Sequence, residues 1–194
     1  MKSVVLMGDS IRLIGYGKRV PELLGEEYSV WQSEDNGRFC YYTLRALFGQ
    51  RLHIENADIV HWNNGLWDIC ELFDDGPFTP EDEYVRVMLR IAGILKQRAR
   101  SVIFATTTPV RPDHPYNDNR VIRAYNERLV PELRKMGIRI NDLYTIVADD
   151  IPGNIREDDK IHLSEKGIEL CAEATAECIR RTAAELDAGT ENKK

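Results

Sequence analysis

Three residues from opposite ends of the chain could together perform nucleophilic catalysis. Ser10 follows a short apolar run and a glycine, in the segment Val4-Val5-Leu6-Met7-Gly8-Asp9-Ser10. His162 lies close to the other end of the chain, and a carboxylate, Asp159, precedes it by three residues. A carboxylate at this spacing can bind the Nδ1–H of the imidazole, which leaves Nε2 free to act as a general base toward a serine hydroxyl.

Each of these residues also has a structural explanation. Serine and aspartate after a strand often cap a helix, because their side-chain oxygens accept hydrogen bonds from free backbone N–H groups. Ser164 is a candidate cap of the same kind for a final helix behind His162. A nucleophile, a base, an orienting acid and amide-rich segments between them nevertheless favour catalysis as a combination, with Asp9 as an acceptor that holds the turn.

Strand-like and helix-like segments alternate along the chain, and this predicts where these residues meet. Five apolar segments predict buried strands, at residues 4–7, 28–31, 57–62, 101–106 and 138–140. Such alternation predicts an α/β fold, a three-layer α/β/α sandwich around a five-stranded parallel sheet of the flavodoxin-like kind. Ser10 and the polar segment 63–68 then follow strand ends, at the sheet edge where ligands bind in this architecture.

The helices and loops between these strands have recognisable boundaries. We expect a short helix within 18–25 that Gly25 closes, a helix over 39–49, a helix capped by Thr79, a helix over 121–136 bent at Pro131, and a final helix over 164–186. The segments 107–119 and 151–160 are predicted loops. We expect one domain over residues 1–187, followed by a polar, frayed tail over residues 188–194.

Composition limits the classes of partner and compartment. The 194 residues carry a formal net charge of −6 and no long basic stretch, which argues against nucleic acid or an anionic membrane as the main partner. A small neutral or weakly charged substrate fits better. No apolar run has the length of a signal peptide or a membrane span, so the chain as it stands is expected in the cytoplasm, or outside the cell if a leader was removed. The composition does not predict an oligomeric state.

Two motifs resemble conserved blocks of the SGNH hydrolases, the GDSL esterase and lipase superfamily. Gly8-Asp9-Ser10-Ile11 is similar to the block that carries the nucleophile, and Asp159-Lys160-Ile161-His162 is similar to the D-x-x-H block. The resemblance covers nearly the whole chain and implies an SGNH hydrolase fold with no metal and no organic cofactor. It implies a catalytic triad of Ser10, His162 and Asp159.

The third block of the family departs from its usual form. The G-x-N-D pattern is replaced by Asn63-Asn64-Gly65-Leu66-Trp67-Asp68, which looks like a branch with N-x-G-L-[HW]-D. The resemblance then implies an oxyanion hole made by the N–H groups of Ser10 and Gly37 and the side-chain amide of Asn63. Asn64 is the alternative, because the register is uncertain by one residue.

Three further residues have predicted places. Trp67 could stack on a sugar or an acyl group, or pack against the sheet edge. Thr107, after the fourth strand, is predicted to line the cleft, and His61, within the third strand, is predicted to be a core histidine.

The predicted activity follows from this set of residues. We expect a serine esterase that removes small acyl groups, acetyl above all, with acetylated carbohydrates as the favoured substrates. The alternatives are a thioesterase or lysophospholipase, and a module that binds a glycan or another ligand on the same fold without turnover.

Overall fold

A single parallel sheet organises the chain in the computed structural model, which describes residues 1–191. Its five strands have the order β2-β1-β3-β4-β5, and every neighbouring pair is parallel. The strands are β1 (Lys2–Met7), β2 (Tyr28–Gln32), β3 (Ile59–Asn63), β4 (Ser101–Ala105) and β5 (Arg139–Asn141). The predicted α/β fold is confirmed, and the strand order reverses between β1 and β3, the position at whose carboxyl side ligands bind in this architecture.

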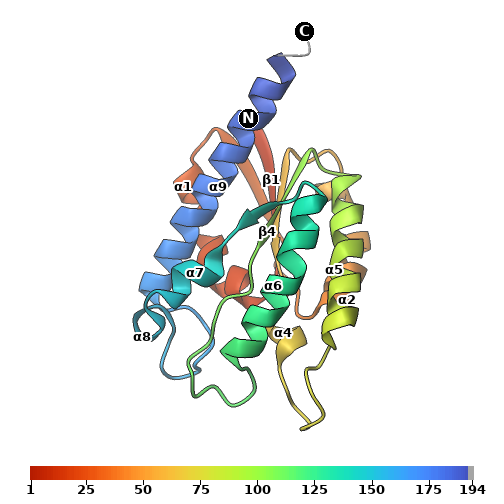
Figure 1. Cartoon of the computed structure of the whole chain (residues 1–194). Coiled ribbons are helices and arrows are strands. Elements are labelled where there is room, and N and C mark those ends of the chain that lie inside the picture. Colours follow the sequence, from red (N-terminus) through yellow and green to blue (C-terminus); the bar gives the residue numbers. More distant parts are fainter. Residues whose placement is uncertain (192–194) are drawn as a thin grey trace.

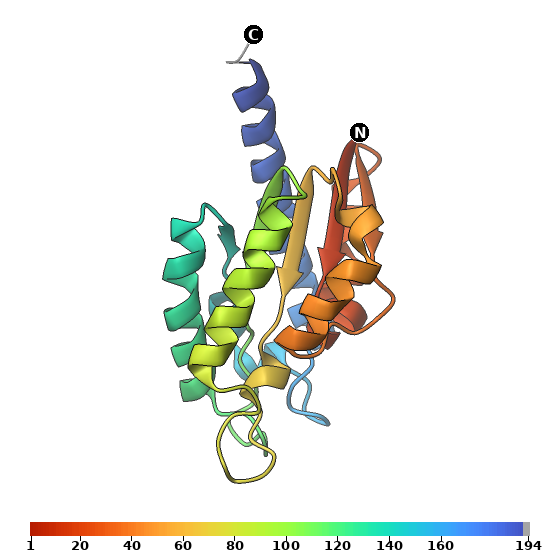
Figure 2. The ribbon, with the colours of Figure 1, turned by 90° about the vertical axis from the view of Figure 1, so that its right-hand side faces the viewer.

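Helices cover both faces of this sheet (Figure 1). Helices α1, α7, α8 and α9 lie on one face, whereas α2, α5 and α6 lie on the other, as the view along the sheet shows (Figure 2). The helices are α1 (Val20–Leu24), α2 (Cys40–Gly49), α3 (Arg51–Ile54), α4 (Leu66–Ile69), α5 (Glu81–Lys96), α6 (Asn119–Lys135), α7 (Leu143–Ala148), α8 (Ile151–Asn154) and α9 (Glu165–Glu191). After β1 the chain forms a π-helical turn, η1 (Ile11–Gly15), and a 3₁₀ turn, η2 (Tyr16–Lys18).

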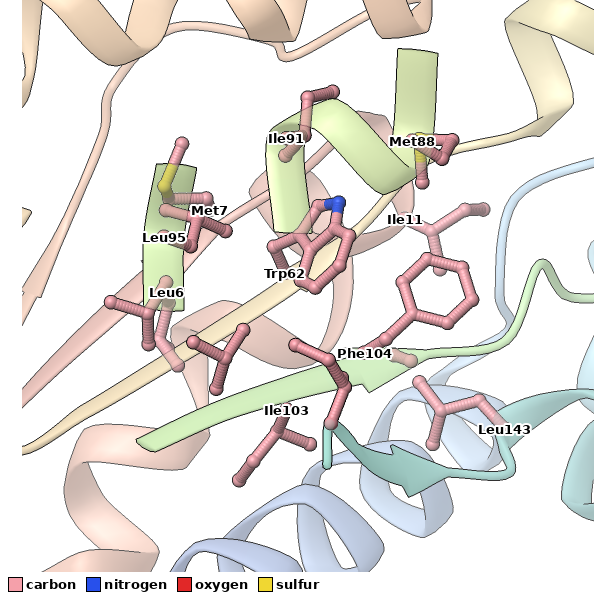
Figure 3. Close-up of a cluster of buried hydrophobic side chains, with 14 of the residues drawn as sticks. Leu6, Met7, Ile11, Trp62, Met88, Ile91, Leu95, Ile103, Phe104 and Leu143 are labelled. Atoms are coloured by element: carbon pink, nitrogen blue, oxygen red, sulfur yellow. The ribbon is translucent and has the colours of Figure 1, made fainter. Parts of the chain in front are cut away.

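The core between α5 and the sheet is centred on Trp62 of β3 (Figure 3). Its indole ring packs on Phe104 of β4, with ring centroids 4.9 Å apart and planes at 57°. From α5, Met88, Ile91 and Leu95 are fully buried on the helix face that meets the sheet. Burying each such side chain contributes about 1.5–3 kcal/mol to the free energy of folding. The packed core therefore holds the ends of β1 and β3 in fixed positions.

Two predicted boundaries on the central and C-terminal helices are wrong. Thr79 does not cap α5, because Pro80 is the N-cap residue and the Thr79 hydroxyl donates instead to Asp68 Oδ1 at 2.8 Å. Helix α9 continues through Leu186 to Glu191, into the segment predicted as a frayed tail. Its last turns project beyond the sheet (Figure 1), where residues with good helix propensity such as Ala188 extend it without a core contact. The remainder of that predicted tail, residues 192–194, lies outside the described residues.

Two other segments begin or fold differently from the prediction. Helix α6 starts at Asn119, because the side chain of Asp118 accepts a hydrogen bond from the Arg120 N–H and caps it, and the helix continues past Pro131. The predicted loop 151–160 contains the short helix α8, whose N-cap Asp150 accepts from the Gly153 N–H. Within residues 1–191, no helix has both the length and the apolar composition that a membrane span requires.

Candidate active site

A tight turn after β1 carries Ser10. Gly8 has a φ of +148°, and a Cβ on Gly8 would lie 1.9 Å from Asn63 Oδ1, so only glycine lets the ends of β1 and β3 approach this closely. Ser10 precedes η1 but its side chain makes no capping hydrogen bond. Ser164, in contrast, does cap α9, because its Oγ accepts from the Gly167 N–H at 3.1 Å. The capping explanation is therefore confirmed for Ser164 and wrong for Ser10.

Ser10, His162 and Asp159 form a continuous hydrogen-bonded chain. Ser10 Oγ lies 2.9 Å from His162 Nε2, and His162 Nδ1 lies 3.0 Å from Asp159 Oδ2. Burial raises the pKa of Asp159, but hydrogen bonds from the N–H groups of His162 and Ile161 and from the His162 ring more than offset this and hold the pKa at about 2. The ionised carboxylate accepts the Nδ1–H, so the Nε2 lone pair can accept the hydrogen of the Ser10 hydroxyl.

The loop that bears Asp159 and His162 is held from two sides. An antiparallel bridge between Ile155 and Leu163 closes it. Arg111, from the loop after β4, donates from Nε to the carbonyl oxygens of Ile155 and Arg156 at 3.2 and 3.0 Å, and from its terminal nitrogen to Pro152 at 2.8 Å. The role of Arg111 has no signal in the sequence, because one arginine in a Pro-rich loop does not indicate which carbonyl oxygens it contacts.

Asp9 lies under the same turn and is structural, as predicted. It is 1 % exposed, and its Oδ1 accepts from the Ile11 N–H at 2.9 Å and from Asn63 Nδ2 at 2.6 Å. Burial raises the pKa of Asp9 to about 6, although these two hydrogen bonds oppose the rise. The other end of the Asn63 amide, Oδ1, accepts from the Tyr16 hydroxyl at 3.0 Å.

Asn64 points into a different environment from Asn63. Asn64 is fully buried, and its Nδ2 donates to the Arg38 carbonyl at 2.9 Å. The backbone carbonyl oxygen of Asn64 accepts from the Thr107 hydroxyl at 2.8 Å. Each of the two side-chain amide nitrogens thus has one described acceptor, and a second hydrogen remains on each. Asn63 is the asparagine that contacts Asp9, in the turn before Ser10.

The predicted role of Gly37 in the oxyanion hole is at odds with its contacts. Its N–H donates to the Gly8 carbonyl at 2.8 Å, so the single amide hydrogen is directed at the β1 turn and not at the space beside Ser10. A Cβ on Gly37 would lie 2.8 Å from the same Gly8 oxygen, which explains why a glycine stands here. The sequence identifies the glycine but not the carbonyl that its N–H meets.

The buried side chain of Arg12 connects the turn after β1 with the loop after β2. It is 0 % exposed, and its guanidinium donates to the carbonyl oxygens of Ser33, Asp35 and Gly8 at 2.6, 2.9 and 3.2 Å. A buried arginine that satisfies three backbone carbonyls holds the loop after β2 against the Ser10 turn. Nothing in the sequence marks Arg12 as a site residue, because an arginine between Ile11 and Leu13 has the pattern of an ordinary surface charge on a short helix.

The two predicted substrate contacts differ in outcome. Thr107 is 3 % exposed, its hydroxyl donates to the Asn64 carbonyl, and its backbone N–H and C=O both bind the Asn126 side chain. The prediction that Thr107 lines the cleft is therefore wrong, because its polar groups already have internal partners. Trp67 lies in α4 with 44 % of its surface exposed, and its contact with a substrate stays a prediction.

His61 is the core histidine that the sequence predicted. It is 0 % exposed, its Nε2 lies 3.1 Å from Asn141 Nδ2, and burial lowers its pKa to about 3. A permanently neutral ring in the sheet cannot serve as an acid or base near neutral pH. In the part of the chain that the structure describes, no group of three or more His, Cys, Asp and Glu side chains is arranged to hold a metal ion.

A parallel sheet of this order joins a serine, a histidine and an aspartate at its carboxyl edge, and solved esterases and lipases share its fold. The acetyl xylan esterase AlAXEase is similar in structure, with a TM-score of 0.73, 20 % identity and coverage of 89 % of this chain and 97 % of that one. The lipase/acylhydrolase of Enterococcus faecalis gives a TM-score of 0.75 at 19 % identity, over 91 % of this chain and 94 % of that one.

A lipolytic protein of the G-D-S-L family from Veillonella parvula gives a TM-score of 0.71 at 19 % identity, over 91 % of this chain and 97 % of that one. No protein-family model matches the sequence, and a search of curated proteins finds no match. The similarity at this level of identity establishes the fold.

Proposed function

We propose that this chain is a serine esterase that hydrolyses small acyl esters, acetyl esters above all, of carbohydrate alcohols. The observation that carries the proposal is the hydrogen-bonded chain from Ser10 Oγ through His162 to Asp159, with distances of 2.9 and 3.0 Å. Nucleophile, base and orienting acid are within hydrogen-bond reach of one another, which is the geometric requirement for acyl transfer through a covalent intermediate.

The mechanism follows from the positions of these atoms. Ser10 Oγ attacks the ester carbonyl while His162 Nε2 takes the hydroxyl proton, and His162 returns that proton to the leaving alcohol. Water then hydrolyses the acyl group on Ser10 with the same base. Asp159, ionised at a pKa of about 2, stabilises the imidazolium throughout.

The negative oxygen that develops on the substrate needs hydrogen-bond donors beside Ser10. The Ser10 N–H and the second hydrogen of Asn63 Nδ2 are the donors that we assign, because Asn63 adjoins the β1 turn through its bond to Asp9. Each such donor contributes about 3–4 kcal/mol to the stability of the transition state.

The likeness to AlAXEase supports an acetyl group on a carbohydrate, since the name of that protein describes an acetyl xylan esterase. The Enterococcus faecalis protein, a lipase/acylhydrolase by name, supports the second candidate, a hydrolase of longer acyl esters. Rates on methyl esters of increasing acyl length separate the two, because an acetylesterase loses activity as the chain grows.

The direct test is hydrolysis of p-nitrophenyl acetate. We expect Ser10→Ala and His162→Ala each to lower kcat by at least about 10³-fold, because each removes one member of a unit that acts together. Ser29→Ala, an exposed serine in β2, is the matched control and should keep the wild-type rate. Unchanged rates in both Ser10→Ala and His162→Ala would refute the proposal. A module that binds without turnover would, in addition, leave Ser10 unlabelled by a fluorophosphonate.

A further inference from the structure

A groove on the outer surface of α2 and α5 collects positive charge. It has a volume of about 460 Å³, and Leu44 of α2 and Ile94 of α5 are among its apolar lining residues. Four exposed arginines line this arginine groove: Arg45, Arg51, Arg90 and Arg98. No Asp or Glu lines it, and within residues 1–191 no carboxylate oxygen lies within 4.0 Å of a nitrogen of these four side chains. The groove is therefore a cationic surface without a described counter-charge, in a chain whose net charge is −6.

Phe48 holds two of these arginines in place. Its ring is 64 % exposed, and the guanidinium carbons of Arg45 and Arg51 lie 5.6 and 4.6 Å from its centroid. A terminal nitrogen of Arg51 also donates to the Phe48 carbonyl at 2.8 Å. Cation–π contacts position the two guanidinium groups but do not neutralise them. The groove is thus preorganised for a ligand that places negative charge next to an apolar side chain.

The loop between α4 and α5 has the complementary chemistry. This acidic loop, Glu71-Leu72-Phe73-Asp74-Asp75, is exposed along its whole length. Phe73 is 74 % exposed and Leu72 is 46 % exposed, although both are large apolar side chains. None of the three carboxylates forms an ion pair with a described residue. Exposed apolar side chains that are rimmed by charge are typical of a surface that binds another protein.

The acidic loop and the arginine groove of one chain lie apart. The loop precedes Glu81, the first residue of α5, whereas Arg90 and Arg98 lie in the second half of that helix. Arg90 follows Glu81 by nine residues, which is about 14 Å along the helix axis. The loop lies beyond the first turn of α5 in both views of the ribbon (Figure 1, Figure 2). A contact between loop and groove therefore requires two molecules.

We infer that the arginine groove binds the acidic loop of a second copy of this chain, and that two copies form a closed, symmetric dimer. When α5 of one copy lies antiparallel beside α5 of the other, each acidic loop is brought to the end of the partner's α5 that carries the arginines. The same contact then occurs twice about a two-fold axis, so that assembly stops at two subunits.

The chemistry of this contact is specific. Phe73 of each copy fills the partner's groove beside Leu44 and Ile94, and the neighbouring carboxylates of Asp74 and Asp75 pair with guanidinium groups. The dimer does not depend on the proposed esterase function, because the groove and the loop contain no residue of the triad.

Charge reversal on each side tests the contact. Sedimentation velocity should show a dimer for the wild type at about 100 µM. The double variants Arg90→Glu/Arg98→Glu and Asp74→Lys/Asp75→Lys should each be monomers, because like charges then face each other. All four positions are exposed, so both variants should keep the wild-type fold. The matched control is Arg180→Glu/Arg181→Glu on α9, which makes the same change of charge on the opposite face of the sheet and should stay a dimer.

Mixing the two charge-reversed variants separates complementarity from damage to the surface. In a mixed pair, one contact keeps the native charges and the other has the charges of both sides exchanged. A dimer should therefore form in the mixture, although each variant alone is a monomer. Phe73→Ala tests the apolar part and should raise the dissociation constant of the dimer by at least about 30-fold, as expected for an anchor residue at the centre of an interface.

Each contrary result would overturn the inference. A wild type that stays monomeric at this concentration would leave the groove to a different acidic ligand. A dimer that persists in either charge-reversed variant, or in Phe73→Ala with an unchanged dissociation constant, would use another surface. A mixture in which both variants remain monomers would show that the loss did not come from charge complementarity.

Discussion

Asp9 and Asp159 are two carboxylates of the same site with opposite protonation behaviour. Asp9 is buried, and its pKa rises to about 6. The side chain of Asp159 is 31 % exposed and receives two backbone N–H groups and the His162 ring, and its pKa falls to about 2. Partial access to water and an ionisable partner preserve the charge of Asp159, whereas burial against neutral donors destabilises that of Asp9. Asp159 can therefore orient a base, whereas Asp9 stabilises the turn before Ser10.

The largest expected effect comes from removing the charge of Asp159. Asp159→Asn keeps the shape of the side chain but no longer fixes the Nδ1–H of His162, so we expect kcat for p-nitrophenyl acetate to fall by about 10⁴-fold. Asp158→Asn is the matched control, since Asp158 is exposed and pairs with Arg156, and it should stay within about twofold of wild type. Similar losses of kcat in both variants would mean that the conformation of the loop, and not the charge of Asp159, determines the rate.

An intermediate effect is expected at the amide partner of Asp9. Asn63→Ala removes the donor to Asp9 and the proposed oxyanion donor, and kcat should fall by about 10²- to 10³-fold. Asn64→Ala removes a buried bond to the Arg38 carbonyl, so its main effect should be a loss of about 1–3 kcal/mol in the free energy of unfolding. The reverse result, with kcat lost in Asn64→Ala, would assign the oxyanion position to Asn64.

The smallest effect concerns the stability of the Asp9 turn as pH changes. The pKa of Asp9 is about 6 in the folded state against 3.8 as the reference value, so the folded state holds its proton to higher pH. Its contribution to stability is therefore present below about pH 4 and is lost as pH rises toward 6, by about 3 kcal/mol at most. Asp9→Asn cannot titrate and lacks this loss.

Urea unfolding of the wild type and Asp9→Asn at pH 4 and pH 7 measures this difference directly. The wild type should lose stability relative to Asp9→Asn between the two pH values. A difference between the two proteins that is the same at both pH values would show that Asp9 does not titrate in this range, and the contrast with Asp159 would then lose its basis.

Local patterns in the sequence predict the strands of the sheet and the pairing of Asp159 with His162, because each depends on features near in the chain. Buried strands such as 57–62 are recognisable as apolar runs, and Asp159 lies only three residues from His162. Ser10 lies at the other end of the chain, and its place in the triad comes from the family resemblance. Contacts between distant segments have no such signal. Thr79 looks like a helix cap but binds Asp68, and Gly37 looks like an oxyanion donor but binds Gly8.

The contacts of buried polar groups are the second feature that the sequence does not predict. Arg12 and Thr107 look like surface or cleft residues in their local sequence, yet both are buried and satisfied by backbone groups of other segments. Their partners are set by tertiary packing, and local propensity says nothing about which carbonyl a side chain meets.

The bridge between Ile155 and Leu163 has a consequence for motion. The bridge and the Arg111 contacts make the loop between them one unit, so the separation of Asp159 and His162 is set within that unit. The separation of His162 and Ser10 joins this unit to the end of β1. A displacement of this loop against the sheet would therefore lengthen the contact between His162 and Ser10 and leave the contact between Asp159 and His162, which fixes the imidazole tautomer, unchanged.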